Sequence, residues 1–479
     1  MSDYKDAWLP KYRDMVPKAA HGFATCMYSM SLEAWRRGLD VTFKFKNKRR
    51  LFYGISYTVS NGVKTHHFDG SMGDISDPAT IKICRNKGLT NEFLRKADVP
   101  TPLGRAFDEE SDNAEIIEYA LEIGFPLVIK PIDSGGGYGV VTNIQSKEEF
   151  EKHLINLRNK LGKKAVIAER FIKGEDYRIL VLDGEVIGAY HRRALSVLGN
   201  GKDTIEVLLK KKVKERNASP FLKGKKIKVD QDMVNFLKEQ NKDVNYIPKE
   251  GERVYLRRNG EYFGQRDSVN MTDKLNSEIK QIAIDAVNAI PGLKYGGVDM
   301  LINYEDNEFV VNEVNSKPQI GNHLFPMEGE AVDVPRIIFD YYFPETKYNE
   351  TPYASYYYDF KPIRENFKSA TASEIKLPRL PDKNAIIKEY IFIGENFNKK
   401  LFNKIKRESR GLSISGKLEV LSDNKFNLQI SGTRENVEKL VTKIKEKKLR
   451  KDTNIEQIEE KIFNGPIKAG FEIINNQQN

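Results

Sequence analysis

The spacing of apolar and polar positions predicts a small α/β domain at the start of the chain. Residues 21–40 (HGFATCMYSMSLEAWRRGLD) have the pattern of a helix that ends near Gly38, a residue type common at helix C-termini. The VTFKF segment that follows alternates in the manner of a strand. LFYGISYTV and VKTHHF then flank Asn61-Gly62, a dipeptide typical of a hairpin turn. We therefore expect residues 1–85 to form one α/β unit.

Residues 86–345 show a longer succession of helix and strand patterns. Two helices are expected in 86–124, around VPTPLGRAF. The apolar strand FPLVIKPI leads into the glycine-rich segment DSGGGYG, then into the strand VVTNI and a helix over KEEFEKHLINLRNKL. Strands KAVIAERFI, DYRILVLDG and EVIGAYHRRA follow, with a hairpin turn at Asp183-Gly184. An amphipathic helix at 274–290 precedes GGVDMLINYEDNEFVVNEVN, which has the pattern of two strands joined by a polar turn.

The rest of the chain divides into three parts. Residues 346–385 are rich in Tyr, Pro and Lys, which is typical of a linker. Residues 386–450 show a β-α-β-β-α pattern, and residues 451–479 are expected to be a polar tail that frays. The predicted fold class is therefore α/β (α+β), with an N-terminal α/β domain, a larger α/β domain at 86–345 and a small C-terminal domain.

Composition is that of a soluble globular protein, with 479 residues, 39% of them hydrophobic and 30% charged. No apolar stretch approaches the roughly 20 residues of a membrane helix, and the first fifteen residues lack the apolar run of a signal peptide. Cys26 and Cys84 are expected to be buried thiols in a reducing cytoplasm. Six scattered histidines show no zinc-binding spacing. We therefore expect a cytoplasmic protein without a membrane partner.

The net charge of +10 is concentrated near the C-terminus. Between residues 388 and 450 there are 16 basic and 8 acidic residues, so this segment carries 16 − 8 = +8. Such a surface would suit a polyanionic partner, but a solvated basic face is the commoner explanation. A nucleic-acid partner is not expected.

Three polar residues lie in two strongly apolar strands. Asp299 is in VDMLI, and Glu313 and Asn315 lie two apart in FVVNEVN, so the last two share a face of their strand. A hairpin would bring Asp299 opposite them. Carboxylate and amide oxygens suit magnesium, and charged groups in buried strands need a partner or a metal. Residues of an ordinary surface strand remain the alternative to a metal site.

Two further segments have the chemistry of a nucleotide site. Lys130 ends an apolar strand just before a run of glycines, whose backbone amides can approach phosphate oxygens closely, although a flexible turn explains the run equally well. The segment matches neither the Walker nor the dinucleotide-binding pattern. In AERFIKGEDYR, Glu169, Phe171 and Ile172 would offer a slot for a purine and Glu175 would accept ribose hydroxyls. Taken alone, this segment is more simply a strand and a polar turn.

The order of these segments resembles the ATP-grasp superfamily. The chain reads K…KP-x-x-x-G-G-G-x-G…ER-F-I-x-G-x-D-Y-R…G-G-V-D…NEVNSKP, and DYRILVLDGEVIGAYHRR, LGNGKDTIEVLL, EGERVYLRRN and NMTD occur in the same order. The closer resemblance is to the ATP-grasp part of cyanophycin synthetases and of bifunctional glutathione synthetases. It covers roughly residues 80–345 and implies an ATP-grasp fold.

The resemblance assigns the phosphate end of the nucleotide site. It implies that Lys87 and Lys130 are the two nucleotide lysines and that Arg192 lies near the γ-phosphate, with Arg193 as a possible substitute. The glycine loop would fold over the phosphates through Gly135, Gly136 and Gly137.

The resemblance also assigns the adenine end and the metal. Glu169 and the backbone near Phe171 and Ile172 match the adenine-binding hinge, Glu175 matches the ribose acceptor, and Leu301 matches a residue under the adenine ring. The metal ligands implied are Asp299, Glu313 and Asn315, for two magnesium ions, with manganese as an alternative.

The implied activity is that of a carboxylate–amine ligase, which forms an amide bond through an acyl phosphate. The substrates would be an amino acid, a peptide or a related metabolite carrying a carboxylate and an amine. A small-molecule kinase is an alternative, as is a nucleotide-binding regulatory module with a polyanion-binding C-terminal domain. Relatives of this kind commonly form dimers or tetramers, so a homodimer or homotetramer is expected.

The expected substrate region departs from those relatives. A Ser-Thr-Gly-Gly stretch before x-x-T-D is replaced here by Phe263, Gly264, Gln265 and Arg266, which indicates a different substrate. Arg258, assigned a catalytic role with Lys130 and Arg192, and Arg266 would each be able to clamp a carboxylate or phosphate. A surface salt bridge is the alternative for Arg266.

The C-terminal segment 386–450 resembles an acylphosphatase, a ferredoxin-like fold. The catalytic arginine and asparagine of that family align with Lys400 and Val420, and its glycine-rich loop is not kept in IGENFN. Without donors aimed at phosphoryl oxygens, such a domain cannot act as a phosphatase. We expect a binding or assembly role instead.

Overall fold

The computed structural model describes residues 4–45, 54–133, 137–224, 227–258, 265–350, 353–380, 385–446 and 453–475, in two compact units. The first unit comprises residues 1–9 and 68–338, and the second comprises residues 10–67 and 339–479. The predicted 1–85 domain is therefore divided between them. Within the described residues, no helix is long and apolar enough to cross a membrane.

The first unit contains a four-stranded antiparallel sheet. Its strand order is β5-β8-β6-β7, and helices α5 and α6 cover a core that includes Phe107, Ile129 and Phe150. Helices α3 and α4 precede it in the chain. The bounds are α3 Pro78–Arg85, α4 Lys87–Lys96, β5 Gly104–Phe107, α5 Asn113–Ile123, β6 Leu127–Pro131, β7 Val141–Ile144, α6 Lys147–Ile155 and β8 Val166–Arg170.

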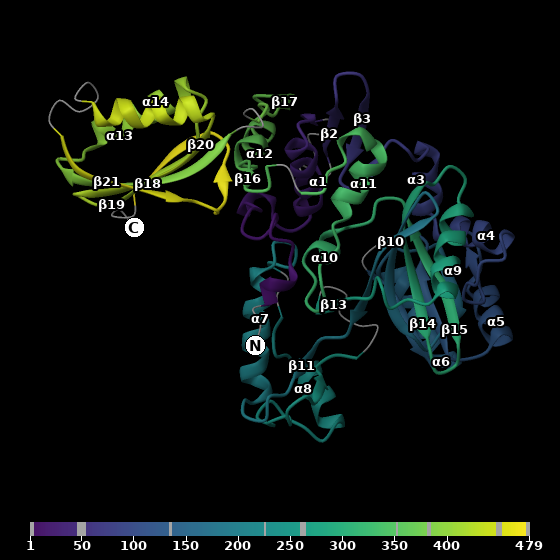
Figure 1. The fold of residues 1–479 in the computed structure, drawn as a ribbon. Helices are drawn as coiled ribbons and strands as arrows, with labels where there is room; N and C mark the ends of the chain where they lie inside the picture. Colours follow the sequence, from purple (N-terminus) through teal and green to yellow (C-terminus); the bar gives the residue numbers. More distant parts are fainter. Residues whose placement is uncertain are drawn as a thin grey trace. The chain divides into compact units, whose positions relative to one another are not determined.

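A second, antiparallel sheet in the same unit has the order β13-β10-β9-β14-β15. One face carries the apolar residues of the core, such as Ile179, Val298 and Met300, and packs against α9, as Figure 1 shows. The alternate residues point to the other face, which is where the candidate site lies. The bounds are β9 Glu175–Leu182, β10 Glu185–Arg193, β13 Asp267–Asn270, α9 Ser277–Asn288, β14 Tyr295–Asn303 and β15 Glu308–Asn315.

A small subdomain is inserted between β10 and β13. Strands β11 (Ser196–Leu198) and β12 (Arg253–Tyr255) pair, and α7 (Ile205–Ala218) and α8 (Gln231–Glu239) complete a separate core around Leu195 and Leu237. After β15 the chain forms the short helix α10 (Gly321–Leu324) and then α11 (Val334–Tyr342).

The N-terminal part of the second unit is built on α1 (Ala24–Arg36), β1 (Asp40–Phe45) and β2 (Ile55–Ser60). The predicted helix and its C-terminal Gly38, at a φ of 79°, are confirmed. Strand β3 (Thr65–Asp69) lies where the second unit gives way to the first, and β4 (Met72–Gly73) follows.

The prediction that residues 346–385 form a linker is wrong. This segment contains β16 (Tyr356–Tyr357), α12 (Lys361–Lys368) and β17 (Glu374–Lys376), and β17 pairs antiparallel with β1. Tyr358 is buried against Tyr28 with ring centroids 4.8 Å apart, and its hydroxyl lies 2.6 Å from the Ser31 hydroxyl. A composition rich in Tyr and Pro is typical of a linker, but a buried tyrosine ring with a satisfied hydroxyl contributes a large apolar area to a core.

The C-terminal domain has the predicted β-α-β-β-α order, with α13 and α14 packed on one side of its sheet (Figure 1). The elements are β18 Ile386–Glu395, α13 Lys399–Gly411, β19 Ser415–Ser422, β20 Lys425–Gly432 and α14 Arg434–Lys445. Val420 is a buried core residue. The relation to acylphosphatases stays a prediction.

The prediction that residues 451–479 are a frayed tail is wrong. They supply β21 (Asn454–Ile462), β22 (Ile467–Lys468) and β23 (Phe471–Asn475), and the sheet order is β21-β18-β20-β19-β23. β21 is an edge strand, and edge strands commonly carry charged side chains that discourage pairing with other chains. Its sequence, NIEQIEEKI, therefore has the composition of a tail although it pairs along β18.

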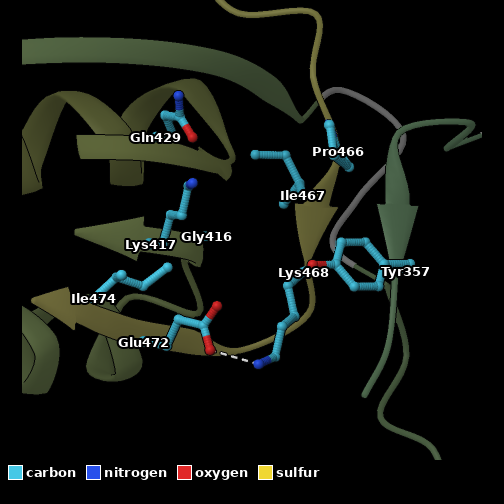
Figure 2. A pocket seen from close by; sticks show the side chains of 9 residues that line it. All are labelled: Tyr357, Gly416, Lys417, Gln429, Pro466, Ile467, Lys468, Glu472 and Ile474. Carbon is cyan, nitrogen blue, oxygen red and sulfur yellow. Dashed lines mark hydrogen bonds and ion pairs between the residues drawn. The ribbon is translucent and has the colours of Figure 1, made fainter. Parts of the chain in front are cut away.

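A pocket of about 120 Å³ lies within the second unit, between β16 and the C-terminal sheet. Figure 2 shows Lys417, Gln429 and Glu472 among its lining side chains, with Lys468 paired to Glu472 at 2.5 Å. None of its lining residues is among those that the sequence assigns to the ATP site.

Candidate active site

The hairpin of β14 and β15 brings the three predicted metal ligands onto one face. Asp299 pairs with Glu313 across the strands, and Gly297 pairs with Asn315. The Asn315 amide nitrogen lies 3.5 Å from the Asp299 carboxylate. The register shifts between Asp299 and Met300, as at a β-bulge, a feature that often redirects a side chain at a functional site. The hairpin that the sequence predicted is therefore confirmed.

Two arginines from neighbouring strands hold Asp299. Arg178 on β9 faces it in the sheet register and donates from Nη2 at 2.9 Å, with a second bond from Nε, and Arg192 on β10 donates at 2.8 Å. Burial alone would raise the pKa of Asp299, but the charges of the two arginines outweigh burial and lower the pKa to about 2. Asp299 is therefore a carboxylate at neutral pH.

The predicted nucleotide lysine Lys87 contacts the predicted metal ligand Glu313. Lys87 is the first residue of α4, and Asn86 caps that helix by accepting from the Leu89 backbone N–H. The Lys87 ammonium lies 3.0 Å from the Glu313 carboxylate. The cap thus fixes the helix terminus that presents a cation to the β14–β15 hairpin.

Lys130 connects the two sheets of the first unit. Its ammonium lies 2.5 Å from Glu169 on β8 and donates to the Asn312 side chain on β15 at 3.0 Å. Both Lys130 and Glu169 are buried, and the other Glu169 oxygen has no hydrogen-bond partner among the described residues. A buried acceptor of this kind, beside a lysine between two sheets, suits a ligand with donor groups such as an adenine amine.

The predicted adenine and ribose residues lie along the same side of the unit. The Phe171 backbone N–H donates to the Pro126 carbonyl at 3.0 Å, and Ile172 is buried. Leu301 on β14 lies opposite Asp176 on β9, and Asp176 directly follows Glu175 in the chain. Their roles in nucleotide binding stay predictions.

The glycine loop is described only in part. Gly135 and Gly136 lie outside the described residues. Gly137 has a φ of 77°, a conformation that residues with a side chain rarely adopt, so a glycine is required there.

Arg266 belongs to the buried cluster and not to the protein surface. It pairs with Asp176, which Arg192 also contacts at 3.0 Å, and it is 7% exposed. The alternative of a surface salt bridge is therefore wrong. Phe263 and Gly264, which precede Arg266, lie outside the described residues. The Gln265 side-chain oxygen accepts a hydrogen bond from Arg257 Nε at 3.1 Å.

Two other arginines lie away from this cluster. Arg193 pairs with Glu328, which Arg253 also contacts at 3.3 Å, and in a strand Arg193 points to the opposite face from Arg192. Arg258, predicted to be catalytic, pairs with the exposed Glu239 on α8. The structure does not bring Arg258 to Asp299.

The sequence assigned no role to Asp176 or Arg178, although both contact the predicted catalytic residues. Their signal was present: in DYRILVLDG they lie two apart, so they share a strand face, and both are charged in an otherwise apolar strand. The residues that Asp176 and Arg178 face depend on how β9 aligns with β14, and the sequence does not show this alignment.

The donor set fits magnesium in its chemistry. Asp299, Glu313 and the Asn315 amide oxygen are hard oxygen donors on one face of a hairpin. Within the described residues there is no group of three or more His, Cys, Asp and Glu placed to hold a metal, and the third donor proposed here is an amide. Arg178, Arg192 and Lys87 now neutralise the carboxylates, so a metal would compete with these ion pairs.

The chain has a mixed α/β fold, as the sequence predicted. More particularly, residues 84–197 match the family model of the RimK-like ATP-grasp domain.

Among curated proteins, the chain is similar to a glutathione biosynthesis bifunctional protein of Clostridium perfringens (32% identity, covering 62% of this chain and 38% of the relative). It is also similar to a cyanophycin synthetase of Trichormus variabilis (29%, covering 61% and 33%). Among solved structures, a bifunctional glutathione synthetase from Pasteurella multocida is 25% identical, with a TM-score of 0.47, covering 60% and 40%. The chain thus spans about a third to two fifths of these relatives.

Proposed function

We propose that this chain is an ATP-dependent carboxylate–amine ligase that forms an amide bond through an acyl phosphate. The observation that carries the proposal is the β14–β15 hairpin, which places the carboxylates of Asp299 and Glu313 on one face and in contact with Arg192 and Lys87. Oxygen donors for a divalent cation and cations for phosphate oxygens are thus combined at one place. Phosphoryl transfer requires this combination.

ATP would lie between the two sheets that Lys130 connects. Lys130 and Lys87 would bind phosphate oxygens as point charges, and Glu169 would face the adenine end. Asp299, Glu313 and Asn315 would hold magnesium, which neutralises charge on the phosphates when bound.

In the proposed reaction a substrate carboxylate oxygen attacks the γ-phosphorus, and the bond from that phosphorus to the β–γ bridging oxygen breaks to release ADP. An amine then attacks the acyl phosphate, releasing phosphate and, on losing a proton, forming the amide. In this proposal Arg192 would neutralise charge as the carboxylate anion attacks the phosphate, which is also an anion. Positioning supplies much of the remaining rate enhancement, so no protein nucleophile is needed.

The substrates do not transfer from the named relatives, because the chain covers only 33–38% of those proteins. The substrate region also departs from the families that the sequence resembles, at Gln265 and Arg266. An amino acid, a peptide or a related metabolite is the substrate class proposed.

The test uses the full chain with ATP, magnesium and pools of amino acids and dipeptides, and measures ADP, free phosphate and product mass. ADP with free phosphate and a condensed product supports the ligase. A phosphorylated product without free phosphate would instead indicate a kinase. Asn315→Ala should abolish turnover, whereas the exposed Asn245→Ala serves as the matched control.

A further inference from the structure

The pocket shown in Figure 2 lies on the C-terminal sheet, on the face opposite its helices. Leu418 on β19 and Ile473 on β23 belong to the core that α13 and α14 cover. Successive side chains of a strand point to opposite faces, so Lys417 and Ile474 point away from that core and line the pocket. Tyr357 on β16, which pairs with β22, lines the pocket as well. The pocket therefore lies between the C-terminal sheet and a strand from outside that sheet.

Two oppositely charged side chains are neighbours in the pocket and do not pair with each other. In the sheet register Lys417 lies opposite Glu472 on β23 and opposite Gln429 on β20. Residues opposite each other on adjacent strands are about 5 Å apart and share a face, and an opposite-charge pair there is stabilising. The Lys417 ammonium instead lies 3.3 Å from Glu419, and Glu472 pairs with Lys468. A cation and an anion thus line the same pocket with room between them.

Three side chains that line the pocket keep an oxygen without a hydrogen-bond partner among the described residues. Glu472 accepts from Lys468 through Oε2, and its Oε1 accepts no hydrogen bond. Gln429 donates from Nε2 to Glu389 at 2.6 Å, and its Oε1 accepts none either. The half-buried Tyr357 hydroxyl also makes none. Polar groups at buried sites are nearly always satisfied, so these oxygens indicate a place for a bound polar group.

The charges favour a ligand that carries both signs. Each lysine of the pocket already has a carboxylate beside it, because Lys468 also lies 3.6 Å from Asp359, so a simple anion would compete with these carboxylates. A simple cation at Glu472 would lie beside the Lys417 ammonium, which repels it. A zwitterion instead places its carboxylate at Lys417 and its ammonium at Glu472, so both of its charges are matched.

The volume of the pocket limits the ligand to a small molecule. The pocket measures about 120 Å³. An apolar cavity of about 150 Å³ in another protein holds benzene, so this pocket has room for about five or six non-hydrogen atoms. Glycine and alanine are zwitterions of this size. Ile467 and Ile474 would supply an apolar wall for a methyl group.

We propose that this pocket binds a small free amino acid such as glycine or L-alanine. The Lys417 ammonium and the Tyr357 hydroxyl would donate to its carboxylate, and its ammonium would donate to the free oxygens of Glu472 and Gln429. Such a ligand would connect β16 to the C-terminal sheet. The proposal does not rest on the ligase function, because none of the residues that line the pocket is assigned to the ATP site.

Isothermal titration calorimetry of the full chain, without ATP or magnesium, tests the proposal directly. The probes are glycine and L-alanine, with propionate and ethylamine as small molecules that each keep only one of the two charges. We expect at least one of the amino acids to bind tenfold or more tightly than both propionate and ethylamine, because only the zwitterion matches Lys417 and Glu472 together.

Substitutions then assign the binding to this pocket. Glu472→Gln and Lys417→Gln each remove one charge, and each should weaken the amino acid about 10- to 100-fold. Tyr357→Phe, which breaks no hydrogen bond of the described structure, should weaken it about three- to tenfold. Glu460→Gln is the matched control: it breaks the pair between Glu460 and Lys388, 2.6 Å apart on the same sheet and outside the pocket, and should leave the affinity unchanged.

The proposal is overturned if neither amino acid binds, or if propionate or ethylamine binds as tightly as the better amino acid. Wild-type affinity in folded Glu472→Gln and Lys417→Gln would also overturn it, because the amino acid would then bind elsewhere, for example at the substrate site. If one charge variant does not fold, the other decides, and Tyr357→Phe decides if both fail. Failure of the ligase proposal would look different: no pool of carboxylates and amines would yield ADP, whereas the amino acid would still bind and depend on Glu472.

Discussion

Replacing Asp299 by asparagine should destabilise the first unit as well as abolish turnover. The change keeps the shape of the side chain and removes its charge. Arg178 and Arg192, which both contact this carboxylate, would then face an amide. Arg192 would keep its contact with Asp176, which Arg266 also contacts, whereas Arg178 would lose the carboxylate that it faces in the sheet.

The magnitude follows from the burial of these charges. A shift of the Asp299 pKa from 3.8 to about 2 corresponds to about 2–3 kcal/mol of stability at neutral pH. Removing one partner from a buried ion pair typically costs about 3–5 kcal/mol. For a unit of this size, a loss of about 3 kcal/mol lowers the melting temperature by about 5–10 °C.

Glu313→Gln is the matched control. It also removes a predicted metal ligand, but the ion pair that it breaks is more exposed than those of Asp299. The Glu313 side chain is 26% exposed, and it forms an ion pair with Lys87. Such a pair contributes about 0–1 kcal/mol. Glu313→Gln should therefore melt within about 2 °C of the wild type while losing turnover as completely as Asp299→Asn.

Differential scanning calorimetry and ADP release measure the two effects. Equal melting temperatures for Asp299→Asn and the wild type would refute the electrostatic reasoning. Wild-type turnover in either variant would refute the metal assignment.

The pH dependence of stability gives an independent check of the same ion pairs. The pKa of Asp299 is lowered on folding, so its contribution is present above about pH 4 and is lost as the pH falls through about 2. Acid unfolding of Asp299→Asn should lack this component, so the stability difference between variant and wild type should shrink between pH 4 and pH 2.

Three further changes test other parts of the chain. Lys130→Met leaves buried Glu169 without its cation and should weaken binding of a fluorescent ATP analogue at least tenfold, whereas unchanged affinity would remove Lys130 from the site. Arg258→Gln should change turnover less than threefold, since its partner is the exposed Glu239, and a hundredfold loss would restore the catalytic role predicted from the sequence. Deleting residues 451–479 should lower the melting temperature or cause aggregation by removing β21 and β23 from their sheet, whereas a true tail would be dispensable.

Most individual elements were predictable because they follow local patterns. Hydrophobic periodicity was enough to predict the helix that ends before Gly38, and the turn residues Asp183-Gly184 were enough to predict a hairpin. The division into units was not predictable, because β17 pairs with β1 across more than 300 residues. Sequence patterns of period two or 3.6 describe which face of a segment is apolar, and not which distant segment covers it.

The same limit applies to the site. Alternation placed Glu313 and Asn315 on one face, and a hairpin was enough to add Asp299. The arginine that faces Asp299 depended instead on the register of β9 against β14, and a shift of one residue would have turned Arg178 into the apolar core. Charged residues in apolar strands can thus be recognised as a site from sequence, whereas their pairing cannot.

The arginine contacts of Asp299 also bear on how the site would work. Magnesium and the arginines compete for the same carboxylate, so metal binding would free Arg178 and Arg192 from part of their present pairing. In the proposed function the arginines would contact the phosphate and carboxylate anions that react, and burial makes an unpaired guanidinium costly. Binding of metal at Asp299 and binding of anions at the arginines should therefore favour one another. The metal and the unpaired arginines would then be present together only when the phosphate and carboxylate groups of the two substrates are there to neutralise their positive charge.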